Sequence, residues 1–216
     1  MLSYHYQTMD PRFKSPYTMV LAGPTGSGKT QFVKSLLRNI HTLVTPVPET
    51  ILFCYGEWQS TYKDIQQLTL NINFIEGLPD LDAMTMGEPK LIIIDDLMGE
   101  TNEQVSRLFT KGSHHKNISV IYIVQNLFNK QKEQRTISLN CHYMVLFKNP
   151  RDRSQIIHLA KQMYPKQNHF LQEAYKMATA EPFSYLLVDL RQDTPEHLRL
   201  RGDIFQDHQT VYTPRQ

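Results

Sequence analysis

The octet at residues 23–30 constrains the fold more than any other stretch of the chain. It reads Gly-Pro-Thr-Gly-Ser-Gly-Lys-Thr and fits G-x-x-x-x-G-K-[ST], a loop whose backbone N–H groups surround nucleotide phosphates. In such a loop the glycines permit the tight turn, Lys29 contacts the β- and γ-phosphates, and the Thr30 hydroxyl joins the ligands of Mg²⁺. The predicted phosphate-binding residues are Gly23, Pro24, Thr25, Gly26, Ser27, Gly28, Lys29 and Thr30.

The segments on either side supply the setting that this motif needs. Residues 17–22 are β-prone, and apolar side chains at helical spacing follow the loop as far as Ile40. A helix that starts at the loop points its positive end at the phosphates. The segment therefore predicts a strand, a phosphate loop and a helix that together bind a nucleotide and Mg²⁺.

Length and composition predict one globular α/β domain without a membrane span. The chain has 216 residues, is 40% hydrophobic and has a mean hydropathy of -0.43. No aliphatic run is long enough to cross a bilayer, and the N-terminus lacks the pattern of a secretory signal. Cys54 and Cys141 lie far apart in β-prone stretches, which predicts buried free thiols and an intracellular, reducing compartment.

A second motif lies at residues 89–96, where an aliphatic run ends in Asp95 and Asp96. Such a run is typical of a central strand that is buried on both faces, and open α/β sheets bind ligands at the carboxyl ends of their strands. We expect Asp95 to hold Mg²⁺, mostly through water, and Asp96 to orient or deprotonate the attacking water. Glu100 is a weaker candidate for the base.

A third strand is expected at residues 118–124 and ends in Gln125 and Asn126. A glutamine amide both donates and accepts hydrogen bonds, so Gln125 at a strand end can sense the γ-phosphate or position water. The alternative is an ordinary polar turn.

The stretch between these strands predicts a helix that ends near Gly112 and carries several cations at its end. A cation there could reach the γ-phosphate of a neighbouring subunit and stabilise charge in the transition state, with Arg107 and Lys111 as candidates. A solvated basic loop is the alternative. Zinc at His114 and His115 lacks further ligands at a suitable spacing.

The remaining apolar segments predict further strands and two late helices that complete a mostly parallel sheet flanked by helices. The strands are expected at residues 50–56, 72–76, 141–147 and 183–189, and the helices around residues 156–163 and 170–175, separated at Pro165. We divide the chain into an N-terminal arm at residues 1–16, a core at 17–190 and a tail at 191–216 that is peripheral or ordered by a partner.

The net charge of +2 does not indicate nucleic-acid binding by bulk basicity, so contacts with DNA would need local patches. Basic residues gather near residues 130–135 and again near 148–153, each time with an acidic neighbour. A solvated face is the ordinary interpretation. The sharper one is a DNA-tracking loop at residues 127–135, which follows Gln125 directly.

The order of these motifs resembles the FtsK–HerA branch of P-loop motors. Residues 108–125 are similar to that branch's helix and glutamine-tipped strand, and residues 143–152 to its following strand and turn. Within the branch, residues 95–98, 111–115 and 125–128 are most similar to the genome-packaging ATPases of Polinton-like and adinto-like viruses, which are related to the poxvirus packaging ATPase. The similarity covers about residues 17–205.

The resemblance implies a RecA-like core that forms a homo-oligomeric ring, hydrolyses ATP at subunit interfaces and drives double-stranded DNA into a capsid, with a capsid or portal partner. The resemblance implies that the family's roles in nucleotide binding and hydrolysis belong here to Lys29, Thr30, Asp95, Asp96 and Gln125. Cellular translocases usually have Glu where this chain has Asp96. The interface cation is ambiguous between Arg107, Lys111 and Lys116, and the chain beyond residue 189 is too short for a nuclease domain.

Three rival functions keep the same phosphate loop. A small-molecule kinase would need an Arg-rich lid and an acceptor pocket, and would show substrate-dependent phosphoryl transfer. A DNA translocase in replication or recombination would share the motor core. A binding module that uses ATP to set its shape is the third. The intact Lys29, Asp95 and Asp96 argue against it, whereas Asp in place of Glu at residue 96 leaves it open.

Overall fold

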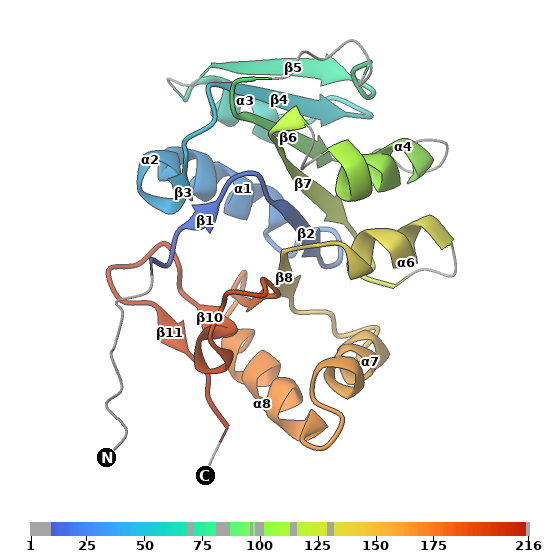
Figure 1. Cartoon of the computed structure of the whole chain (residues 1–216), viewed down its shortest axis with the longest axis vertical. Coiled ribbons are helices and arrows are strands. Elements are labelled where there is room, and N and C mark those ends of the chain that lie inside the picture. The colour runs from blue at the N-terminus through green and yellow to red at the C-terminus, as the bar shows by residue number, and fades with distance from the viewer. Residues whose placement is uncertain are drawn as a thin grey trace.

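A computed structural model describes residues 10–68, 71–80, 87–95, 97, 102–112, 116–128 and 132–214. Within these ranges the main sheet has nine strands (Figure 1). From one edge to the other they are β11 (Thr210–Val211), β10 (Leu200–Gly202), β9 (Tyr185–Asp189), β8 (Tyr143–Phe147), β2 (Thr18–Ala22), β7 (Ile118–Val124), β6 (Lys90–Asp95), β4 (Thr50–Tyr55) and β5 (Ile72–Glu76).

The sheet is mostly parallel, as the sequence predicted. The neighbours from β8 to β5 all pair in parallel, whereas β9, β10 and β11 continue the sheet by antiparallel pairing. One side of the sheet, called the carboxyl edge below, therefore carries the carboxyl ends of β2, β4, β6, β7 and β8. Because β9 is antiparallel to β8, its first residues come to that same edge.

The central strands are aliphatic because both of their faces are covered. Successive side chains of a strand point to opposite faces. In β6, Ile92 and Ile94 belong to one buried cluster while Leu91 and Ile93 belong to the other. This two-sided burial is typical of parallel sheets.

Helices cover each face of the sheet (Figure 1). One face carries α1 (Lys29–Arg38), α2 (Ile40–Leu43) and α3 (Thr61–Gln66), whose buried side chains join the cluster of Phe32, Leu36 and Ile65. The other face carries α4 (Asn102–Arg107), the π-helical turn η1 (Leu108–Gly112), α6 (Lys132–Leu139), α7 (Ser154–Met163) and α8 (Asn168–Ala178).

Most expected elements are confirmed, and one interpretation is wrong. The predicted helix is observed as α4, which continues into η1 as far as Gly112; its end near Gly112 stays a prediction, because residues 113–115 lie outside the described ranges. The two late helices lie on either side of Pro165 as expected. The proposed DNA-tracking loop at residues 127–135 is not a continuous loop, because α6 begins at Lys132 and buries Ile137 against the sheet.

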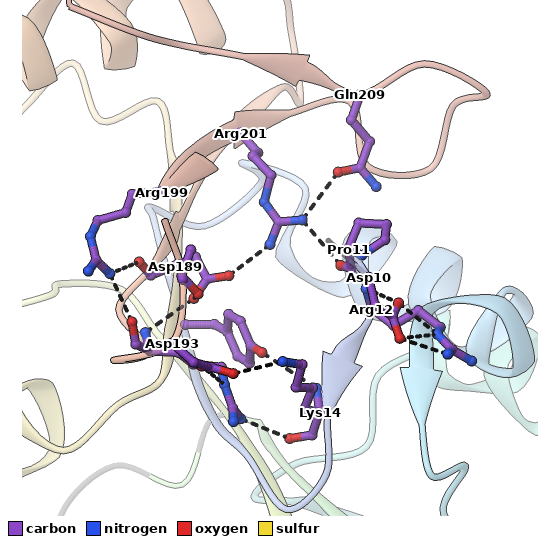
Figure 2. A network of polar contacts seen from close by, with 12 residues as sticks. Asp10, Pro11, Arg12, Lys14, Asp189, Asp193, Arg199, Arg201 and Gln209 are labelled. Atoms are coloured by element: carbon purple, nitrogen blue, oxygen red, sulfur yellow. Dashed lines mark hydrogen bonds and ion pairs between the residues drawn. The ribbon is translucent and has the colours of Figure 1, made fainter. Parts of the chain in front are cut away.

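The N-terminal arm and the C-terminal tail contact each other, and the tail extends the main sheet beyond β9. In the arm, β1 (Phe13–Lys14) pairs with β3 (Val44–Thr45), and the tail adds the short η2 (Glu196–Leu198) before β10 and β11. Polar contacts connect these segments (Figure 2): Arg201 donates to Asp189 at 3.0 Å and to the carbonyl of Pro11 at 3.1 Å. The domain boundaries at residues 16 and 190 stay predictions.

Every helix within the described ranges is too short or too polar to span a membrane.

Candidate active site

The loop at residues 23–28 turns sharply between β2 and α1. Gly26 and Gly28 have φ angles of 77° and 106°, which side chains other than glycine rarely adopt. The Ser27 N–H donates to the Pro24 carbonyl at 3.2 Å, and the Phe32 N–H donates to the Gly28 carbonyl at 2.9 Å. Helix α1 therefore begins directly at the loop, where the positive end of its dipole favours an anion.

Lys29 is held at the base of this loop. Its Nζ atom donates to the carbonyl oxygens of Gly23 at 2.6 Å and Pro24 at 2.9 Å. The side chain is half-buried, so its positive charge lies beside the loop rather than in bulk solvent. The Ser27 hydroxyl is buried and has no hydrogen-bond partner among the described residues.

Asp95 ends β6 and is buried, with 6% of its surface exposed. The Tyr62 hydroxyl of α3 donates to Asp95 Oδ2 at 3.0 Å, which fixes the orientation of the carboxylate. Thr30 on α1 lines the same cleft. A hydroxyl and a carboxylate are the hard oxygen donors that Mg²⁺ prefers, so these two residues fit that ion.

Gln125 lies between the loop and Asp95 because β7 is inserted between β2 and β6. Ala22 pairs with Val124, and Ile123 pairs with Asp95. The Gln125 side chain is exposed toward the cleft.

The turn that follows Gln125 is anchored to α7. Gln155, which is buried, accepts from the Leu127 N–H at 2.6 Å and donates to Asn126 Oδ1 at 3.2 Å. These bonds restrain the strand end that carries Gln125.

The phosphate loop, Thr30, Asp95 and Gln125 line one cleft of about 360 Å³ at the carboxyl edge of the sheet. Burial raises the pKa of Tyr122 in its wall, so this phenol stays neutral at physiological pH. The described lining residues are Thr25, Gly26, Gly28, Lys29, Thr30, Gln31, Gln59, Thr61, Asp95, Leu97, Tyr122, Ile123, Val124, Gln125 and Phe183.

The predicted interface cations lie elsewhere, and several predicted residues lie outside the described ranges. Arg107 is exposed at the end of α4, and Lys116 precedes β7 at the opposite edge of the sheet. The backbone of Lys111 lies in η1, but its side chain is outside the described part. Asp96, Glu100, His114 and His115 are also outside it.

Three residues near the site were missed from the sequence. Tyr62 lies in a helix too short to show a clear period, Gln155 lies in a polar stretch, and Phe183 looks like the first residue of a strand. For Gln155 the available signal was its place directly before the apolar positions of the helix predicted at residues 156–163. Within the described residues, no cluster of three or more His, Cys, Asp or Glu side chains could hold a metal by itself.

Comparison with known proteins assigns the family. The family model described as "Poxvirus A32 protein" matches residues 4–181, while none of the curated proteins compared with the chain matches it. The cytoplasmic domain of the Thermomonospora curvata type VII secretion ATPase EccC is similar at 11% identity and a TM-score of 0.44, over 59% of this chain and 20% of that chain. Since the family match covers most of the sequence, the chain belongs to the Poxvirus A32 protein family of viral packaging ATPases and is an ATPase, as its resemblance predicted.

Proposed function

We propose that this ATPase translocates double-stranded DNA into a viral capsid in an infected cell, and that it acts as a ring of identical subunits. One observation carries the proposal: the phosphate loop, Asp95 and Gln125 line a single cleft at the carboxyl edge of the sheet. This is where open α/β sheets bind nucleotides. The family assignment supplies the packaging context and implies a capsid or portal partner.

In this proposal the loop holds the nucleotide phosphates through backbone N–H groups and the start of α1. Lys29 exchanges its bond with the Gly23 or Pro24 carbonyl for a phosphate oxygen. A charge-assisted bond to phosphate is stronger than the bond to a neutral carbonyl, so the exchange favours the bound state.

Thr30 and Asp95 are the proposed ligands of Mg²⁺, which when bound neutralises phosphate charge. Tyr62 keeps the Asp95 carboxylate in place through its hydrogen bond. Asp96, the next residue along the chain, is the proposed group that orients or deprotonates the attacking water. Gln125 positions that water or senses the γ-phosphate.

A neighbouring subunit is the proposed source of the remaining positive charge. Among the described residues that line the cleft, Lys29 supplies the positive charge. Arg107 is exposed and lies outside the cleft. Arg107 can therefore act on another subunit's nucleotide, with Lys111 and Lys116 as alternatives. A cation that arrives from outside the site stabilises the charge of the transferring phosphoryl group.

The test is steady-state ATP hydrolysis over a range of protein concentrations, with and without linear duplex DNA. A shared site predicts a rate per subunit that rises with protein concentration and rises again with DNA. Asp96→Asn should abolish hydrolysis, and Lys29→Met should abolish nucleotide binding. A rate per subunit that ignores both protein concentration and DNA would contradict the motor.

Mixing variants tests the shared site directly. Arg107→Ala has an intact phosphate loop, and Lys29→Met keeps an intact Arg107. If Arg107 acts on a neighbour, the mixture should hydrolyse ATP although each variant alone does not. The same mixture made with Lys111→Ala or Lys116→Ala identifies the cation if it is another one, and no restoration with any of them would contradict a finger acting between subunits.

A further inference from the structure

The turn before β9 places an aromatic side chain in an unusual conformation. The Ser184 N–H donates to the Glu181 carbonyl at 3.3 Å and closes the turn. Pro182 is its second residue, and Phe183, the third, has a φ of 64°. A proline followed by a positive φ is typical of a type II turn, whose third position favours glycine or asparagine. Phe183 is nevertheless 67% exposed.

This aromatic side chain lies beside the phosphate loop. Phe183 lines the same cleft as Lys29 and Asp95. A Cβ atom added to Gly28 would lie 3.2 Å from the Phe183 Cβ and 3.4 Å from its Cδ1, so the side chain begins in contact distance of the loop. The antiparallel direction of β9 is what brings the turn to this edge, because Tyr185 pairs with the last residue of β8.

The sheet order gives the cleft two chemically different sides. Asp95 and Gln125 follow β6 and β7, on one side of β2. Phe183 precedes β9, on the other side of β2. A nucleotide whose γ-phosphate faces Gln125 extends its other end, the base, toward the β8 and β9 side.

We infer that Phe183 stacks on the base of the bound nucleoside triphosphate. The inference rests on the proposed function, because it requires the triphosphate to occupy the phosphate loop. Aromatic side chains stack on nucleobases through the π-face that every base offers. An apolar ring kept exposed and in a disfavoured backbone conformation indicates that the position serves a ligand rather than the core. The nucleotide then buries the ring that the fold leaves in solvent.

The test separates the base from the phosphates. Dissociation constants are measured for ATP and for inorganic tripolyphosphate with the wild type, Phe183→Asn and Phe183→Tyr. Asparagine accepts the positive φ without an aromatic plane, so it removes stacking and leaves the turn intact. We expect Phe183→Asn to weaken ATP binding by about 10-fold or more and to leave tripolyphosphate unchanged. Phe183→Tyr should retain the wild-type affinity for both.

A fluorescence readout reports the contact itself. The chain has one tryptophan, Trp58, so Trp58→Phe combined with Phe183→Trp places a single tryptophan in the turn. Stacking predicts that ATP quenches its fluorescence and that tripolyphosphate does not.

Three results would overturn the inference. Phe183→Asn could leave ATP affinity unchanged, or weaken ATP and tripolyphosphate equally, which would mean that the ring supports Gly28. It could also change solely the dependence of hydrolysis on protein concentration, which would place the ring at a subunit contact. The Lys29→Met variant tests the proposed nucleotide site separately from the Phe183 inference. If that variant bound ATP and tripolyphosphate normally, the triphosphate would bind elsewhere and the proposed site itself would be wrong.

Discussion

The buried ion pair between Asp189 and Arg201 provides a quantitative test of how the tail is attached to the core. Each side chain is 4% exposed, and Arg201 Nη2 donates to Asp189 Oδ2 at 3.0 Å (Figure 2). The other carboxylate oxygen accepts from the Thr194 hydroxyl at 2.8 Å. Asp189→Asn keeps the size of the side chain but leaves the Arg201 guanidinium buried without a counter-charge.

The expected loss is large because a buried charge cannot be solvated by water. Removing one partner of a buried pair costs about 3–5 kcal/mol of unfolding free energy. For a domain of this size each kcal/mol shifts the melting temperature by about 2–4 °C, so Asp189→Asn should melt roughly 6–20 °C below the wild type. Asp189→Asn combined with Arg201→Met removes both charges and should be less destabilised than Asp189→Asn alone.

An exposed ion pair in the same network serves as the matched control. Lys14 Nζ lies 2.7 Å from Asp193 Oδ2, but these side chains are 41% and 50% exposed. Surface pairs contribute about 0–1 kcal/mol, so Asp193→Asn should lower the unfolding free energy by less than about 1 kcal/mol. Urea denaturation followed by far-UV circular dichroism measures all four proteins. Equal midpoints for Asp189→Asn and Asp193→Asn would refute the argument from burial.

Two further predictions concern the cleft and the cysteines. Tyr62→Phe removes the bond that orients Asp95, so ATP hydrolysis should need about 10-fold more Mg²⁺ for half-maximal rate; an unchanged Mg²⁺ midpoint would contradict this role. Burial raises the pKa of the Cys54 and Cys141 thiols to about 12, which keeps them protonated. Because the folded pKa lies above the unfolded value of about 8.5, ionisation of these thiols favours unfolding as pH rises above that value. A thiol reagent at pH 8 should therefore label the unfolded chain much faster than the native one, and equal labelling rates would show that the thiols are accessible.

The sequence predicted the central strands well because burial on both faces requires aliphatic runs. The strands that carry the phosphate loop, Asp95 and Gln125 each occupy such a run. The bounds of β7 are those predicted, and those of β2 and β6 differ by one residue at an end. The motifs also indicated the individual residues of the phosphate loop, Asp95 and Gln125 that line the described part of the cleft.

The edge of the sheet beyond β8 was not predictable in the same way. The direction of β9 depends on how the α8 connection returns to the sheet, which a strand pattern does not encode. An arginine in a tail segment normally indicates a solvated, charged stretch, so β10 was not recognised as a strand. Arg201 is buried in the fold because it pairs with Asp189. The segment now seen as α6 was interpreted as a basic loop, since cations flank its few buried side chains.

Contacts between segments far apart in the chain account for the residues that were missed. Tyr62 and Asp95 are 33 positions apart, and Gln155 reaches a backbone N–H 28 positions earlier. Nothing near Tyr62 indicates that its hydroxyl faces a carboxylate. Two features single out Phe183: its positive φ and its close approach to Gly28. Both are properties of the folded chain.

The order of the motifs along the chain differs from their order in space, and this difference explains the cleft. In sequence the phosphate loop comes first, Asp95 second and Gln125 third, but the insertion of β7 between β2 and β6 puts Gln125 in the middle. In the proposed function, this middle position lets Gln125 respond both to the γ-phosphate and to the attacking water. The turn beyond it bonds to Gln155 of α7, which lies at the opposite face of the sheet from α1. If Gln125 senses the γ-phosphate as proposed, these bonds would connect the nucleotide site to the helices on that face.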